Sequence, residues 1–279
     1  MESVRWPGLP GLLAALGLDE TPLALFFADA PPEGALNPAP LEQPTRQREL
    51  AGEINWGAVF GGFTCAIGHL WRARRKHKPA WFSADHYGCP GAFFWLGFTK
   101  PQTEAIVHYV SSGIPNQMHG ERYLATPDEC RAVFAAADPP PVPKPYLVAK
   151  PIDLMAPAEE PELVVFFARP EALAGLHQLA TFVTGRPEIV RSPFSAGCGS
   201  IVGWPRHYLA QGEDMVAVLG GWDPSARKYY KTDELSFTVS AKLFAAMVEK
   251  WPGSFLAGKT WAGSRQKIAR SRRAWGEDQ

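Results

Sequence analysis

Continuous apolar runs predict the strands of this chain. Residues 21–28 and 163–168 carry the two clearest runs, and both end in the motif Phe-Phe-Ala. Runs of this length and composition are typical of buried strands. Residues 80–83 and 215–219 predict two shorter strands of the same kind.

Helices are predicted where apolar residues recur at helical spacing or where Pro and Gly mark the ends. The predicted helices cover residues 9–18, 61–76, 103–112, 127–137, 170–184 and 234–251. A further helix-like run covers residues 92–97 and follows Pro90, a residue type favoured at the first position of a helix. The Pro-rich segments 31–44 and 138–151 are predicted to be loops or linkers.

The order strand, helix, strand, Gly-Cys occurs twice along the chain. The second copy ends at Gly197-Cys198, whereas the first ends at Gly88-Cys89 and carries a Pro-rich insertion near residues 31–60. This repetition predicts an α/β fold, with α+β as the alternative, built from two pseudo-symmetric strand-helix-strand units packed as one compact body. We expect the first repeat unit over residues 1–150 and the second over residues 151–279.

Composition and charge exclude several classes of protein. The 279 residues have a formal net charge of zero, so no overall electric field attracts nucleic acid or an anionic membrane. Their hydrophobic content of 46% is ordinary for a globular protein. No run approaches the roughly 18 apolar residues of a membrane span, and the first residues lack a signal-peptide pattern. The basic tail over residues 258–275 lacks a nucleic-acid-binding motif. We therefore expect a cytoplasmic protein without membrane or nucleic-acid partners.

The cysteines are the main functional signal. Four cysteines in so long a chain favour reduced thiols or metal ligands over a disulfide scaffold. Cys89 and Cys198 hold matched positions in the two copies, so a site between the units would receive both. Cys65 lies on the helix before the Cys89 strand and is the third candidate. We also expect Cys89 to cap the helix that starts at Pro90, where the positive helix end would lower its thiol pKa.

Three thiolates on three elements could hold an iron–sulfur cluster, [4Fe-4S] being the first choice, with one iron open to a substrate or small anion. A zinc ion with one open position is the second choice. If Cys130 supplied a fourth ligand, the closed shell would favour electron transfer with a redox partner. The chain has no Cys-x-x-Cys pair, so the spacing alone is not diagnostic.

Two other classes of function stay open. A thiol-dependent enzyme would use Cys89 as nucleophile and His86 or His69 as base. A metal-free protein could bind a small molecule in an aromatic pocket between the halves, since the chain contains ten tryptophans. Arg206 could bind an anionic substrate, although a salt bridge is its simpler role. The sequence leaves open whether the protein is an enzyme, which ligand or redox partner it binds, and whether it forms a homo-oligomer.

Several of these segments together resemble one prokaryotic family, catalogued as domain of unknown function 169. The resemblance is carried by the strand at Phe26-Phe27, by Cys65, by Gly88-Cys89-Pro90-Gly91 with Leu96-Gly97, and by Ser195-Ala196-Gly197-Cys198-Gly199. It covers roughly residues 10–255. Members commonly have cysteines in these three places, so the resemblance implies that Cys65, Cys89 and Cys198 form one group and leaves Cys130 outside it. It implies no reaction.

Overall fold

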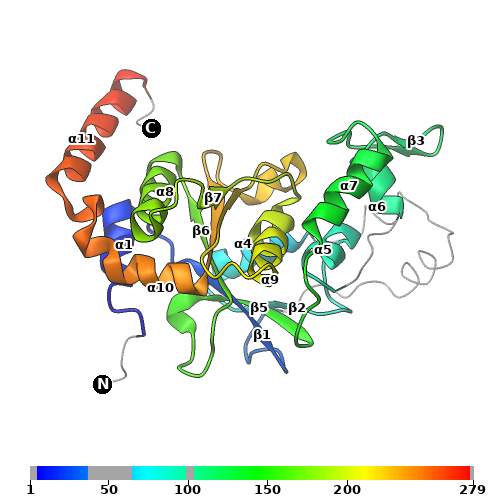
Figure 1. The fold of residues 1–279 in the computed structure, drawn as a ribbon, viewed down its shortest axis with the longest axis horizontal. Helices are drawn as coiled ribbons and strands as arrows, with labels where there is room; N and C mark the ends of the chain where they lie inside the picture. The colour runs from blue at the N-terminus through cyan, green and yellow to red at the C-terminus, as the bar shows by residue number, and fades with distance from the viewer. Residues whose placement is uncertain (1–4, 37–64, 99–103, 277–279) are drawn as a thin grey trace.

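A seven-stranded mixed sheet forms the centre of the computed structural model, which describes residues 5–36, 65–98 and 104–276 (Figure 1). Its strands are β1 (Leu23–Ala28), β2 (Ala80–Phe82), β5 (Tyr146–Pro151), β6 (Leu163–Ala168), β7 (Val190–Arg191), β8 (Ala217–Gly220) and β9 (Leu235–Ser240). They lie in the order β2-β5-β1-β6-β9-β8-β7, and only β7 with β8 is a parallel pair within this sheet. The predicted α/β fold is confirmed.

Helices cover both faces of the sheet. One face packs against α1 (Leu9–Leu16), α8 (Pro170–Thr184) and α10 (Ala241–Lys250). The core on the other face contains residues of α4 (Ala66–Lys76), α5 (Pro90–Trp95), α6 (Glu104–Val110), α7 (Pro127–Ala137) and α9 (Trp204–Ala210). Successive residues of a strand face opposite sides. Accordingly, Val165 packs in the core that includes α4 and α9, whereas Phe166 packs in the core that includes α8 and α10. None of the helices described here is both long and apolar enough to span a membrane.

The two strands that share the Phe-Phe-Ala motif, β1 and β6, are antiparallel neighbours where the halves meet. Leu23 pairs with Val165, and Leu25 pairs with Leu163. Leu23 and Leu163 begin their respective strands, so the register is the one that a local two-fold axis would produce. The predicted pseudo-symmetry therefore holds for the central strands. The helices do not follow it, because α4 and α8 lie on opposite faces.

The predicted division at residue 150 falls inside β5. This strand pairs with β1 and β2, both from the first half of the chain. The division into residues 1–150 and 151–279 stays a prediction about the repeat, while the sheet itself is continuous through both halves. Most of the insertion near 31–60 lies outside the described residues.

The helix predicted over residues 234–251 is wrong in its first part. Residues 235–240 form β9, and helix α10 begins only at Ala241. The sequence Leu-Ser-Phe-Thr-Val-Ser alternates apolar and hydroxyl side chains, which is the period of a strand. Ser240 then accepts a hydrogen bond from the Leu243 amide through its side chain, which caps the helix. The linker predicted over 138–151 is also wrong at its end, where β5 begins at Tyr146.

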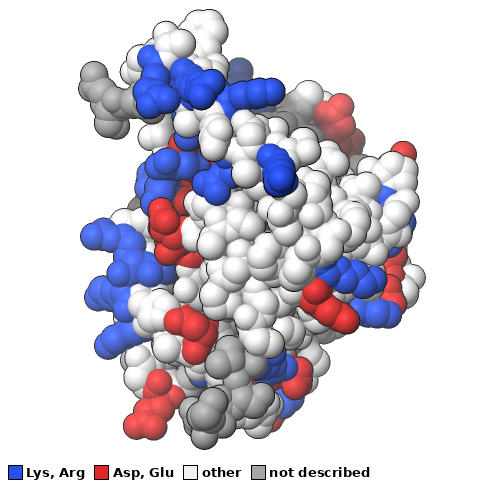
Figure 2. Space-filling model, turned by 90° about the vertical axis from the view of Figure 1, so that its left-hand side faces the viewer, with Lys and Arg blue, Asp and Glu red and all other residues white. Residues whose placement is uncertain are grey.

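The basic tail forms a helix rather than an irregular terminus. Helix α11 (Lys259–Ala274) follows two short 3-10 turns, and every one of its residues is at least partly exposed. Its Arg265 Nε donates to Glu171 of α8 at 2.8 Å. Lys and Arg gather at the upper end of the molecule, where α11 lies (Figure 2). The tail is thus a packing arm attached to the side of the molecule by an ion pair.

Arg74 joins α4 to two acidic residues from distant parts of the chain. Its Nη2 lies 2.5 Å from Glu20 Oε2 and 2.8 Å from Glu234 Oε1. The guanidinium also lies over the ring of Phe167, at 3.9 Å from the centroid. The Arg74 and Glu234 side chains are only 7% and 3% exposed, so neither charge is well solvated.

We expect Arg74→Met to lower the free energy of unfolding by about 3 kcal/mol, because Glu234 would be left buried without its cation. Urea unfolding followed by circular dichroism measures this change. Arg75→Met on the same helix is the matched control, since Arg75 is exposed and its loss is expected to cost under about 1 kcal/mol. Equal losses in the two variants would contradict a structural role for the Arg74 pair.

Candidate functional site

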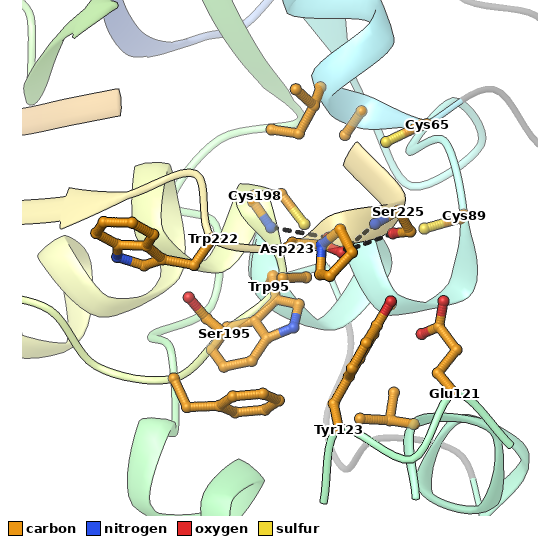
Figure 3. Close-up of a pocket in the computed structure, with 18 of the residues that line it drawn as sticks. Cys65, Cys89, Trp95, Glu121, Tyr123, Ser195, Cys198, Trp222, Asp223 and Ser225 are labelled. Carbon is orange, nitrogen blue, oxygen red and sulfur yellow. Dashed lines mark hydrogen bonds between the residues drawn. The ribbon is translucent and has the colours of Figure 1, made fainter. Parts of the chain in front are cut away.

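The three cysteines predicted to form a group meet at one cavity. Cys65, Cys89 and Cys198 all line a cavity of about 670 Å³, as Figure 3 shows. Cys65 and Cys89 come from the first half of the chain and Cys198 from the second. Cys130 is fully buried on α7, outside the cavity lining. The structure therefore brings together the three predicted residues and separates the fourth.

Two of the three cysteines stand immediately before a helix, and the third lies in the first turn of one. Cys65 precedes α4 and Cys89 precedes α5, so the predicted capping position of Cys89 is confirmed. Cys198 has helical dihedral angles and leads directly into a π-helical segment (Gly199–Gly203) that continues into α9. The helix-start position is thus shared by Cys65 and Cys89, although the sequence pattern indicated it only at Cys89.

The glycines on either side of Cys198 explain how it reaches the other two cysteines. A Cβ atom at Gly197 would lie 2.9 Å from Ile67 Cγ1 on α4, and one at Gly199 would lie 2.7 Å from Trp95 Cδ2 on α5. Both distances are shorter than ordinary carbon contacts. Only glycine lets the backbone around Cys198 approach both helices, which carry Cys65 and Cys89 at their starts. The Gly-Cys-Gly sequence is therefore a requirement of the site.

Burial raises the pKa of all three thiols. The pKa of Cys89 rises to about 12 through burial, with a smaller contribution from the nearby Cys65. Burial likewise raises the pKa of Cys65, and it raises that of Cys198 further still, with Cys89 and Cys65 adding to the effect. The expected lowering of the Cys89 pKa is wrong, because loss of water outweighs the start of the short helix α5. The mutual effects follow from the proximity of the three sulfurs.

The described residues contain no ready-made site for a single metal ion. Within residues 5–36, 65–98 and 104–276, no three His, Cys, Asp or Glu side chains are placed to hold one metal ion. The thiolates of an iron–sulfur cluster bind different irons, so they stand farther apart than the ligands of one ion. Three thiols that line one cavity supply the ligand type that an iron–sulfur cluster requires.

The two histidines considered as bases lie away from the cavity. His69 is buried on α4 with its ring edge-on to Phe82, and burial lowers its pKa to about 4. His86 Nδ1 lies 3.3 Å from Ser83 Oγ, and its ring packs against Trp81. Both lie outside the described lining of the cavity. The geometry thus gives Cys89 neither of the predicted bases.

Arg206 has a structural environment. Its Nε donates to Glu162 at 3.3 Å, and its terminal nitrogens donate to the carbonyl oxygens of Pro140 and Pro141 at 2.8 and 3.1 Å. The guanidinium lies over the ring of Phe27. Arg206 is almost fully buried and holds the segment between α7 and β5 against the sheet, which is the salt-bridge role favoured from the sequence.

Two carboxylates that the sequence analysis missed also line the cavity. Asp223 Oδ2 accepts from the Gly197 amide at 3.3 Å, while Oδ1 accepts from the amide and hydroxyl of Ser225 at 2.9 and 2.7 Å. Glu121 Oε1 accepts from the Tyr109 hydroxyl at 3.2 Å. Burial raises the pKa of Glu121 to about 7, and Asp223 adds to this rise. An Asp before a Pro is a known helix-start signal that could have indicated Asp223, whereas no local pattern indicates Glu121.

Two exposed aromatic residues stand where the cavity opens. Phe194 and Trp222 line it and yet are 41% and 57% exposed. Trp222 Nε1 donates to Ser192 Oγ at 2.8 Å, which joins the two segments that carry these rings. The remaining aromatic residues of the lining are Trp95, Tyr109, Tyr123, Phe134 and Tyr229. The predicted aromatic pocket between the halves therefore coincides with the cysteine site.

Comparison with known proteins adds a family but no activity. Residues 11–250 match the family of domain of unknown function 169, described as uncharacterised ArCR. Neither the curated proteins nor the solved structures contain a significant match to the chain. The matched range includes all three cavity cysteines and the whole central sheet, while α11 lies beyond it.

Proposed function

This chain belongs to the uncharacterised ArCR family of domain of unknown function 169, and we propose that Cys65, Cys89 and Cys198 hold an iron–sulfur cluster in it. One observation carries the proposal: three thiols from three separate elements, and from both halves of the chain, converge on one cavity. A buried free cysteine usually behaves as a small apolar residue, which gives no reason for three of them to line the same cavity.

The ligand number favours an open cluster of the [4Fe-4S] type. Cys130 lies outside the cavity, so the chain offers three thiolates rather than four. When bound, such a cluster would supply an iron without a protein ligand, able to act as a Lewis acid toward a small molecule. The rest of the cavity would hold and orient that molecule.

The electrostatics of the thiols also support metal binding over nucleophilic catalysis. A nucleophilic cysteine needs a lowered pKa or a neighbouring base, whereas here burial and mutual proximity raise the pKa values. Metal cations offset the charge of buried thiolates and displace their protons. The free thiols also fit a reducing compartment, and we place the protein in the cytoplasm.

Purification without oxygen tests this proposal. We expect a brown protein that contains four iron and four acid-labile sulfide per chain, the composition of one [4Fe-4S] cluster. Chemical reconstitution with ferrous iron and sulfide under argon serves if the cluster is lost during purification. A folded, colourless protein that binds no iron or sulfide after reconstitution would overturn the proposal, and stoichiometric zinc would support the second choice of metal.

A further inference from the structure

A second wall of the cavity is polar and comes from the excursion between α6 and α7. This excursion contains a small hairpin of β3 (Gly113–Ile114) and β4 (Met118–His119). Tyr109 stands near the end of α6, while Glu121 and Tyr123 follow the hairpin. In Figure 3 the Glu121 carboxyl and the Tyr123 hydroxyl lie side by side and point into the cavity. The Tyr109 hydroxyl donates to the Glu121 carboxyl, which holds it in this position.

The charges of the cavity disfavour an anionic ligand. Within the described lining, Lys228 is the only Lys or Arg, while Asp223 and Glu121 are both acidic. A [4Fe-4S] cluster held by three thiolates would itself carry a small net negative charge, because the thiolate charges outnumber those of the cationic core. Like charges in a partly buried site repel strongly, because water screens them poorly there. The binding partner of this cavity is therefore expected to carry no negative charge.

The volume of the cavity, of which a bound cluster would fill a part, and its apolar lining set the size and shape of the ligand. A cavity of about 670 Å³ is of the size that holds small organic molecules. The seven aromatic residues of the lining provide flat apolar surfaces, and Phe194 and Trp222 place two of them at the exposed edge. Such surfaces favour a ring or another flat apolar body.

We propose that the cavity binds an uncharged small molecule with a flat apolar body, whose polar end forms hydrogen bonds with Glu121. The proposal rests on the proposed function insofar as the molecule then lies beside the cluster. The aromatic residues contact its body, and the tyrosines fix the Glu121 carboxyl that receives its polar end.

Protonation of Glu121 decides which hydrogen bonds it offers. Its raised pKa, about 7, means that the acid and the carboxylate are both populated near neutral pH. The groups that influence this pKa are Asp223, which raises it, and Tyr109 and Tyr123, which lower it. The acid form donates a hydrogen bond, whereas the carboxylate only accepts. An amide both donates and accepts, so it suits either form, while a carboxylate ligand is repelled once Glu121 ionises.

Benzamide and benzoate are matched probes, because they share a flat ring and differ in charge. We expect benzamide to bind the cluster-loaded protein at least tenfold more tightly than benzoate at pH 8, a difference of about 1.4 kcal/mol. Ligand-detected NMR titration measures both affinities. Glu121→Gln should bring benzoate to within about threefold of benzamide at pH 8, since it removes one of the acidic groups that repel benzoate while Asp223 remains in the lining. Glu121→Ala should weaken benzamide binding about tenfold. Glu188→Gln on the exposed surface is the control and should change neither affinity.

The outcomes separate this proposal from the cluster. Iron and sulfide are measured first on every sample. Their absence would overturn the proposed cluster, while the probe titrations would still test the proposed ligand site at Glu121. Equal binding of the two probes to the native protein would overturn the uncharged-ligand proposal. So would unchanged benzamide affinity in Glu121→Ala, or no benzamide binding at millimolar concentration. Normal circular dichroism of Glu121→Gln confirms that the variant is folded.

Discussion

Cys198→Ser is expected to abolish cluster binding, with the bound iron falling from four atoms per chain to nearly none. A serine hydroxyl is a poor ligand for the thiophilic irons, and two cysteines do not hold the cluster in place. Iron and sulfide analysis after anaerobic reconstitution measures the loss. Cys65→Ser and Cys89→Ser should give the same result, because the three thiols line one cavity.

Cys130→Ser is the matched control for this experiment. Cys130 is more buried than any of the cavity cysteines, and burial raises its thiol pKa to about 11. It lies on α7 and outside the cavity, so its replacement disturbs a buried thiol without removing a proposed ligand. We expect this variant to keep its full iron content despite some loss of stability. Iron loss in Cys130→Ser equal to that in Cys198→Ser would mean that folding, rather than ligation, explains both.

Slow alkylation of Cys89 in the cluster-free protein is the second large effect that we expect. With a pKa of about 12, the thiolate fraction at pH 8 is on the order of 10³-fold lower than for an ordinary cysteine. A more basic thiolate is also more nucleophilic, which offsets part of the rate lost through the smaller thiolate fraction. We therefore expect alkylation by iodoacetamide to be about 50-fold slower than for an exposed thiol. Mass spectrometry of the Cys89 peptide over time measures the rate.

The pH profile of that alkylation separates the two classes of function. If Cys89 is a metal ligand with a raised pKa, its rate should keep rising about tenfold per pH unit from pH 7 to pH 10, because each unit increases the thiolate fraction tenfold. A reactive nucleophile with a lowered pKa would instead reach a plateau below pH 7. A plateau of this kind would contradict the raised pKa and support the thiol-dependent enzyme. Loading the cluster should then protect Cys89 altogether, since its sulfur is bound to iron.

Local sequence patterns predicted the elements that depend on local physics. The apolar runs of β1 and β6 identify two largely buried strands, since few other arrangements keep such continuous apolar sequences from water. Pro90 after Cys89 marks the start of α5 for a similarly local reason. The shared Gly-Cys context pointed to Cys198, and Gly197 and Gly199 prove to be required by close packing. These parts of the site could be predicted because each rests on a single short segment.

The parts that sequence reasoning missed depend on contacts between distant segments. Strand β9 was not predicted because Ser and Thr occupy its alternate positions. Its burial depends on β6 and β8, the strands on either side of it. Glu121 follows a two-residue strand with no periodic pattern, and only tertiary packing brings it into the cavity. The high pKa of Cys89 is likewise a result of burial by other elements. One sequence shows none of these three effects directly.

The pairing of β1 with β6 has the geometry of a fused homodimer. Two separate copies of one ancestral unit, joined along this strand by a two-fold axis, would form the same continuous sheet centre. Such a dimer supplies every cysteine twice, so its shared site can hold only an even number of ligands. Once both units are on one chain, each is free to diverge. The present chain contributes two cysteines from one unit and one from the other, and in the proposed cluster this odd number of ligands would leave a single iron open.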